Sequence, residues 1–130
     1  MPTDTMKGIK KFGIGTDIES IDRFRRLDPA NNSIFLNKVF TKNELNYCFS
    51  KEKAASYLAV RYAGKEAIVK ALGGMDKPSL NYKDIEILNK ENEIPVTRIN
   101  NKDFRDLRVY VTLSHCNDKA IAFAIVMGNN

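Results

Sequence analysis

One long helix near the middle of the chain constrains the fold more than any other feature. The stretch from Ala54 to Leu72 reads AASYLAVRYAGKEAIVKAL and is followed by Gly73-Gly74, a glycine signal typical of helix C-termini. Apolar residues are spread around nearly the whole circumference of this helix, rather than along one stripe, which is typical of a buried helix. We therefore predict a buried helix from about Lys53 to Leu72, with the other elements packed around it.

Two charged residues on one face of this helix need a partner or a ligand. Glu66 and Lys70 are four positions apart, so they lie on the same face of the helix, one turn apart. Glu and Lys side chains are rarely buried unless they form a pair or bind something. An ion pair of structural importance only is one interpretation of these residues, and a ligand site is the other. The helix alone leaves both open.

Before this helix, the sequence predicts one strand and three shorter helices. Lys11 to Ile18 alternates between two faces, as in a half-buried strand. Thr41 and Glu44 have the spacing of a capping box, which opens a helix that ends near Phe49. The other two predicted helices run from Glu19 to Leu27 and from a cap at Asn31-Asn32-Ser33 to Val39.

The second half of the chain has the alternation and the turns of a β-sheet. Four strands are predicted, at Asp84–Leu88, Val96–Ile99, Arg108–His115 and Lys119–Met127. Helices in one block and hairpins in another predict an α+β fold, in which an antiparallel sheet packs against the long central helix and the shorter helices. The length of 130 residues fits a single domain, residues 1–130.

Composition limits the partners and the compartment. The net charge of +5 favours an anionic partner or substrate, although nucleic acid, phosphate esters and acidic proteins all qualify. Two cysteines, Cys48 and Cys116, are too few for a disulfide framework and lack metal-ligand spacing. The amino terminus has no apolar segment before a cleavage site, and the longest apolar run, residues 120–127, is too short to cross a bilayer. We expect a cytoplasmic protein that does not span a membrane.

The glycines near the amino terminus do not form a dinucleotide-binding motif. A third glycine would be needed at position 18, and Gly13-Ile14-Gly15 lies inside the predicted strand. Glycines on the same face as Asp17 leave room for a ligand or for another backbone. The alternative is that they only pack against a helix, while Asp17 caps the helix predicted from Glu19.

Carboxylates and basic residues together suggest a magnesium and phosphate site. Asp17 and Glu66 are the candidate ligands, since Mg²⁺ typically takes one or two protein carboxylates and completes its octahedron with waters and phosphate oxygens. The basic residues Arg61, Lys65 and Lys70 would neutralise the phosphate charge that the metal does not reach.

Three further residues have both a structural and a functional interpretation. His115, the only histidine, stands at the end of a predicted strand, where it is either a hydrogen-bonded structural residue or a contact for a phosphate. Arg23 and Arg26 share a face of the first predicted helix through their i,i+3 spacing. They either form a solvated surface or meet an acidic protein partner.

Five segments of the chain, in this order, resemble the holo-acyl-carrier-protein synthases, the small single-domain phosphopantetheinyl transferases. The segments are Gly13–Ile18, Val39–Leu45, Leu58–Gly73, Asp84–Ile87 and Thr112–His115. The resemblance implies transfer of the 4′-phosphopantetheine arm of coenzyme A onto a serine of apo acyl carrier protein, in fatty acid biosynthesis. The second product would be adenosine 3′,5′-bisphosphate.

The resemblance also implies roles for individual residues. Asp17 and Glu66 would hold Mg²⁺ against the coenzyme A diphosphate, and Glu66, directly or through a metal-bound water, could accept the serine proton. Lys70 would stabilise the diphosphate and the leaving group. Arg61 and His115 would contact the coenzyme A phosphates.

The remaining implied contacts involve the end of the long helix, the carrier and neighbouring subunits. Gly73 would lie against coenzyme A, and Arg23 and Arg26 would meet acidic residues of the carrier protein. The family also implies a homotrimer with active sites between neighbouring subunits, so that exposed apolar strand faces would be subunit interfaces.

Two other functions stay open at this point. A basic nucleic-acid-binding module would need aromatic residues interleaved with basic ones on one surface, and the sequence shows no clear platform of this kind. Another Mg²⁺-dependent phosphate-ester enzyme, such as a hydrolase, would use the same Asp17 and Glu66 pair without a carrier protein. We expect coenzyme A and a carrier, and no nucleic acid, as partners.

Overall fold

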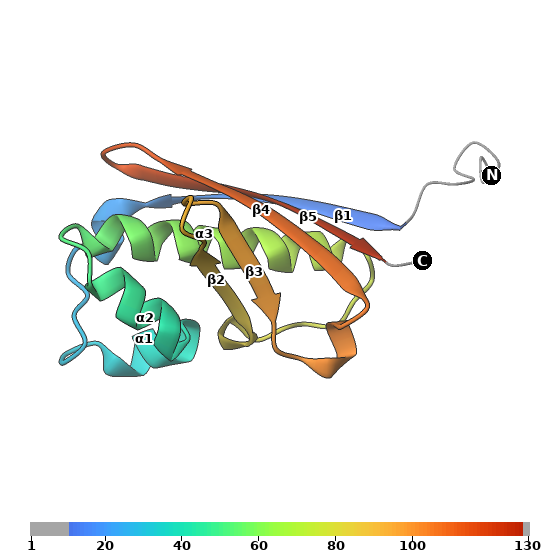
Figure 1. The fold of residues 1–130 in the computed structure, drawn as a ribbon, viewed down its shortest axis with the longest axis horizontal. Helices are drawn as coiled ribbons and strands as arrows, with labels where there is room; N and C mark the ends of the chain where they lie inside the picture. The colour runs from blue at the N-terminus through green and yellow to red at the C-terminus, as the bar shows by residue number, and fades with distance from the viewer. Residues whose placement is uncertain (1–10, 129–130) are drawn as a thin grey trace.

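The computed structural model describes residues 11–128 and places α3 between two layers (Figure 1). A three-stranded sheet covers one side of α3, and the two other helices and a separate strand pair lie on the opposite side. The predicted α+β fold is confirmed. The elements are β1 (Phe12–Ser20), α1 (Ser33–Val39), α2 (Lys42–Phe49), α3 (Ala54–Gly73), β2 (Ile85–Asn89), β3 (Pro95–Ile99), β4 (Leu107–His115) and β5 (Lys119–Gly128).

All strand pairings are antiparallel, as predicted. The larger sheet has the order β1-β5-β4, so the first strand of the chain pairs with the last, and β2 pairs with β3 in the smaller sheet. In the register of β1 and β5, Asp17 lies opposite Ala122. This long-range pairing fixes the position of Asp17 relative to the rest of the sheet.

Two glycines let α3 lie directly on β1. A Cβ atom added to Gly13 would lie 1.9 Å from the carbonyl oxygen of Ala71, and one added to Gly15 would lie 2.0 Å from that of Ala67. No side chain larger than hydrogen fits at these distances. The packing interpretation of the two glycines is therefore confirmed, and the close contact brings the Asp17 end of β1 against the helix.

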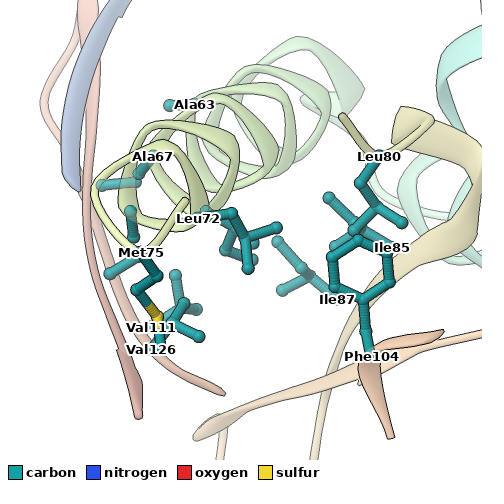
Figure 2. Packing of buried hydrophobic residues seen from close by; sticks show 14 residues of the cluster. Ala63, Ala67, Leu72, Met75, Leu80, Ile85, Ile87, Phe104, Val111 and Val126 are labelled. Carbon is teal, nitrogen blue, oxygen red and sulfur yellow. The ribbon is translucent and has the colours of Figure 1, made fainter. Parts of the chain in front are cut away.

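The core is formed on both sides of α3. Figure 2 shows one cluster, in which Leu72 of the helix lies toward Ile85 and Ile87 of β2, and Ala67 lies on the side of the helix that faces the three-stranded sheet. A second cluster packs α1, α2 and the start of α3 against the turn after β1. Burial of α3 on all sides agrees with its apolar circumference. Both ends of α3 lie within one residue of their predicted positions. No helix within residues 11–128 is both long and apolar enough to cross a bilayer.

The helix predicted from Glu19 to Leu27 is wrong. β1 continues to Ser20, and only a short 3₁₀ turn follows, at Ile21–Phe24. The reason is long-range pairing, because β5 extends far enough to pair with Glu19 and Ser20. Asp17 therefore lies inside a strand and caps no helix, and Arg23 and Arg26 do not share a regular α-helix.

The predicted capping box is present at the start of α2. The Thr41 hydroxyl accepts from the Glu44 amide at 3.1 Å, and the Glu44 carboxylate accepts from the Thr41 amide at 2.8 Å. α1 has its predicted extent, but Asn32 at its N-cap makes no side-chain capping bond. The Glu44 side chain is fully buried, so it also faces the interior.

The two cysteines are expected to differ in reactivity. Cys116 is exposed, whereas Cys48 is buried and burial raises the pKa of its thiol to about 12. Because the thiolate is the reactive form, iodoacetamide should alkylate one cysteine of the folded protein, Cys116, and both cysteines after denaturation. Peptide mass mapping checks this, and rapid alkylation of Cys48 in the folded state would contradict the described packing.

Candidate active site

Three carboxylates, those of Asp17, Glu19 and Glu66, form a group that we call the acidic corner, where β1 meets α3. Asp17 and Glu19 alternate along β1 and share one face of the strand. Lys70, one turn beyond Glu66, donates to the Asp17 carboxylate at 3.3 Å and to the Thr16 carbonyl oxygen at 3.0 Å. The structure thus brings together Asp17, Glu66 and Lys70, which were predicted to belong to one site.

Glu19 is a member of the acidic corner that sequence reasoning missed. Burial raises the pKa of its carboxyl to about 7, and the neighbouring carboxylates of Asp17 and Glu66 contribute to the shift. The signal in the sequence is the spacing of two from Asp17, which puts both side chains on one face of a strand. That signal was hidden because Glu19 was assigned to a helix.

Each carboxylate of the acidic corner accepts a hydrogen bond from a different residue. The Lys70 ammonium donates to Asp17, and the Arg23 guanidinium donates to Glu19 at 3.0 Å. The Tyr82 hydroxyl donates to Glu66. Burial, followed by the hydrogen bond to Glu66, raises the pKa of Tyr82, so its hydroxyl remains a donor. Tyr82 was not identified from the sequence, because its contact with Glu66 arises only from the fold.

The acidic corner has a donor set that fits a hard divalent cation. The Asp17 side chain is 12% exposed, and its Oδ2 atom is buried without a hydrogen-bond partner among residues 11–128. Within the same residues, no three His, Cys, Asp or Glu side chains are already arranged around a common metal position. Two carboxylates suffice for Mg²⁺, which completes its octahedron with waters and phosphate oxygens. Asp17 and Glu66 are the residues that could hold it.

One face of α3 leads from the acidic corner toward solvent. Glu66, Lys70 and Gly73 follow at i, i+4 and i+7, so they line the same face of the helix. Lys70 is exposed, and a Cβ added to Gly73 would have no atom within 4 Å. The interpretation of Glu66 and Lys70 as a structural ion pair is not what the structure shows, since Lys70 pairs with Asp17 instead. This face is therefore open to solvent at Lys70 and Gly73.

Arg61 and His115 occupy a different place. The Arg61 side chain is 1% exposed, and its Nε donates to the Ile87 carbonyl oxygen at 2.8 Å. It lines a small cavity of about 200 Å³ together with His115 and Asn89. Arg61 and Glu66 are five residues apart, which turns their side chains roughly 140° from each other around the helix. One chain alone therefore does not bring Arg61 to the acidic corner.

Lys65 does not face a phosphate site, contrary to its place among the predicted basic groups. Its ammonium is fully buried and lies 2.6 Å from the Glu44 carboxylate, which is also fully buried. It donates as well to the carbonyl oxygens of Val39 and Tyr82, at 2.8 and 2.9 Å. Burial lowers the pKa of Lys65, and Glu44 opposes that shift. The pair connects α2, α3 and the segment before β2.

Arg23 and Arg26 lie on the surface beside the acidic corner. Arg23 is about half exposed, with its guanidinium 5.0 Å from the centre of the Tyr62 ring, a cation–π geometry. Arg26 is exposed in the turn that follows. Because Arg23 also pairs with Glu19, this basic surface adjoins the carboxylates directly.

Raising the pH should destabilise the metal-free protein through Glu19. The pKa of this carboxyl is raised from 4.5 to about 7, so the folded state binds more protons than the unfolded state between these values. Its contribution to stability is fully present below pH 4.5 and is lost as the pH rises through 7. Thermal unfolding in EDTA should show the Tm of Glu19→Gln gaining on that of the unmodified protein over this range. A difference in Tm between the two proteins that stays constant over this pH range would contradict the raised pKa of Glu19.

Known proteins resemble this chain over most of its length. The sequence profile of the 4′-phosphopantetheinyl transferase superfamily matches residues 13–124. A holo-[acyl-carrier-protein] synthase of Chlamydia muridarum is 43% identical over 123 residues, covering 92% of this chain and 97% of that protein. A holo-[acyl-carrier-protein] synthase of Protochlamydia amoebophila is 40% identical over 117 residues, covering 88% and 96%.

A solved structure adds a likeness in three dimensions. The holo-[acyl-carrier-protein] synthase of Helicobacter pylori, determined in complex with coenzyme A, has a TM-score of 0.73 to this chain and 28% sequence identity, and covers 87% of this chain and 98% of its own. The two relatives match most of the sequence, and the profile match over residues 13–124 includes the acidic corner and His115. The chain therefore belongs to the 4′-phosphopantetheinyl transferase superfamily.

Proposed function

We propose that this protein transfers the 4′-phosphopantetheine group of coenzyme A to a serine hydroxyl of apo acyl carrier protein, as a cytoplasmic holo-[acyl-carrier-protein] synthase. The names of its relatives and the coenzyme A complex of the Helicobacter pylori protein support the reaction. The observation in this chain that carries the proposal is the buried Oδ2 of Asp17, which has no hydrogen-bond partner among residues 11–128 and lies beside Glu66 and Lys70. An uncompensated buried carboxylate oxygen is costly unless something binds it.

In the proposed mechanism, Asp17 and Glu66 would hold Mg²⁺. When bound, the ion supplies positive charge to the diphosphate of coenzyme A. Lys70 would neutralise the negative charge of the same diphosphate from the exposed face of α3. Gly73 has no side chain and would leave room for the nucleotide part of coenzyme A. Phosphoryl transfer depends mainly on such positioning and charge neutralisation.

The bonds change as follows. The serine oxygen bonds to the phosphorus that carries pantetheine, and the bond from that phosphorus to the bridging oxygen breaks. Adenosine 3′,5′-bisphosphate leaves with the bridging oxygen. The Glu66 carboxylate accepts the proton of the serine hydroxyl, directly or through a water, and Lys70 stabilises the charge that develops on the leaving phosphate.

We also propose a homotrimer. The outward face of the three-stranded sheet exposes a row of large apolar side chains, which is unusual on the surface of a monomer. These are Phe12, Ile14, Ile18, Ile121 and Phe123, between 42% and 60% exposed. In an assembly of this kind, Arg61 and His115 of one subunit would contact the coenzyme A bound at the acidic corner of its neighbour. This contact would explain why Arg61 and His115 lie away from the acidic corner of their own chain.

Arg23 and Arg26 provide a docking surface for the carrier in this proposal. Acidic residues of the carrier would pair with these guanidinium groups, one of which lies beside Glu19. Complementary charge speeds and orients such encounters. The net charge of +5 acts in the same direction.

The test is a mass measurement on the carrier. The protein is incubated with coenzyme A, Mg²⁺ and an apo acyl carrier protein, and the carrier should gain the mass of phosphopantetheine. Glu66→Gln should slow the gain by at least about 100-fold, the usual scale for removing one essential charge, while Glu91→Gln in the exposed β2–β3 turn should not. Consumption of coenzyme A without a mass gain would indicate a hydrolase instead. No reaction with several carriers, alongside tight nucleic-acid binding, would indicate the binding module.

A further inference from the structure

Tyr82 contacts the acidic corner without belonging to it. It lies in the 3₁₀ turn before β2, sixteen residues after Glu66, and its hydroxyl donates to Oε1 of Glu66. We infer that Tyr82 is a positioning residue, which holds the Glu66 carboxylate in one orientation by occupying one of its two oxygens. This inference rests on the proposed role of Glu66 as a metal ligand.

The aromatic ring of Tyr82 is fixed by its neighbours. It packs edge-on against Tyr62 with 5.8 Å between ring centres and an angle of 75°. Tyr62 in turn packs against Phe24 at 5.5 Å and carries the Arg23 guanidinium on its face. Edge-to-face packing of this kind limits rotation of the ring, so the hydroxyl is held where it meets Glu66.

The backbone of Tyr82 is fixed by the buried ion pair. Its carbonyl oxygen accepts from Lys65 Nζ at 2.9 Å, and Lys65 is held by Glu44 at 2.6 Å. Glu44 also accepts from the amide of Ile87 at 2.8 Å. A buried ion pair is weak support for stability by itself. Here it anchors the segment that carries the Tyr82 hydroxyl to Glu66.

The hydrogen bond should matter for metal binding. A carboxylate that ligates a metal is normally held by a partner, and loss of that partner typically lowers metal affinity or activity by 10–100-fold. Without its hydroxyl partner, Glu66 would sample more rotamers and would be free to turn away from Asp17. Tyr82 therefore acts through Glu66, without contacting the metal or the substrate.

The test uses Mn²⁺ as the probe, because the free ion gives an electron paramagnetic resonance signal that falls on binding. Full-length unmodified protein, Tyr82→Phe, Tyr62→Phe and Glu66→Gln are titrated with Mn²⁺ alone. Tyr62→Phe is the matched control, since it removes a hydroxyl from the adjacent ring of the same aromatic cluster. Circular dichroism verifies that each variant is folded, which we expect because both Phe substitutions retain the ring.

Tyr82→Phe should raise the Kd for Mn²⁺ about 10-fold, and Tyr62→Phe should leave it within about 2-fold, below the range for loss of such a partner. Equal affinity of folded Tyr82→Phe and the unmodified protein would overturn the inference while leaving the metal site intact. Equal losses in both Phe variants would also overturn it, because the effect would then come from the aromatic cluster. Absence of binding by the unmodified protein, or full binding by Glu66→Gln, would instead overturn the metal role of Glu66 on which the inference rests.

Discussion

Replacing Lys65 with methionine should lower the free energy of unfolding by about 3–5 kcal/mol, the usual cost of removing one partner of a buried ion pair. Methionine has nearly the length of the lysine stem but carries no charge, so the fully buried Glu44 carboxyl would lose its cationic partner. The carbonyl oxygens of Val39 and Tyr82 would also lose their donor. Urea unfolding followed by circular dichroism measures the change.

Lys70→Met provides the control for this prediction. Lys70 also pairs with a carboxylate, at 3.3 Å, but its side chain is 54% exposed, and exposed ion pairs contribute roughly 0–1 kcal/mol. The double variant Glu44→Gln with Lys65→Met should be less unstable than the sum of the two single changes, because it leaves no unpaired charge. Strict additivity, or a loss no larger than that of Lys70→Met, would mean that the Glu44–Lys65 pair is not the buried contact described.

Gly15→Ala should destabilise the protein by about 3 kcal/mol or more, at the upper end of overpacking effects. The added methyl group would lie 2.0 Å from the carbonyl oxygen of Ala67, and neither backbone can move without breaking strand pairing or helix hydrogen bonds. Relief requires that β1 and α3 move apart, which would also separate Asp17 from Lys70. The variant should therefore lose both stability, measured by thermal unfolding, and transferase activity.

Gly73→Ala is the matched substitution in open space. No atom lies within 4 Å of its added Cβ, and alanine is favoured over glycine in a helix by roughly 1 kcal/mol. Its stability should equal or exceed that of the unmodified protein. If Gly15→Ala were as stable as Gly73→Ala, the direct contact of β1 with α3 would be wrong.

The sequence predicted a helix well where residues within that segment determine its conformation. α3 lies within one residue of its predicted bounds because its apolar circumference and terminal glycines are properties of one segment. α2 begins at its predicted capping box for the same reason. The segment after Asp17 was mispredicted because its conformation depends on β5, about a hundred residues later in the chain.

The candidate site was predictable in part. Asp17, Glu66 and Lys70 could be grouped by charge, spacing and resemblance, and the structure brings them together. No sequence pattern shows that Lys65 pairs with Glu44, because the two are 21 residues apart on different helices. Tyr82 was missed for the same reason, since its contact with Glu66 joins a loop to a helix through the fold.

A crystal structure with Mg²⁺ and coenzyme A tests the central claim most directly, which is that residues from β1 and α3 share one ion. The account predicts an oxygen of Asp17 and an oxygen of Glu66 at about 2.0–2.1 Å from the same Mg²⁺, with a diphosphate oxygen of coenzyme A in the same octahedron. An ion held by only one of these carboxylates, or a diphosphate bound away from both, would contradict it.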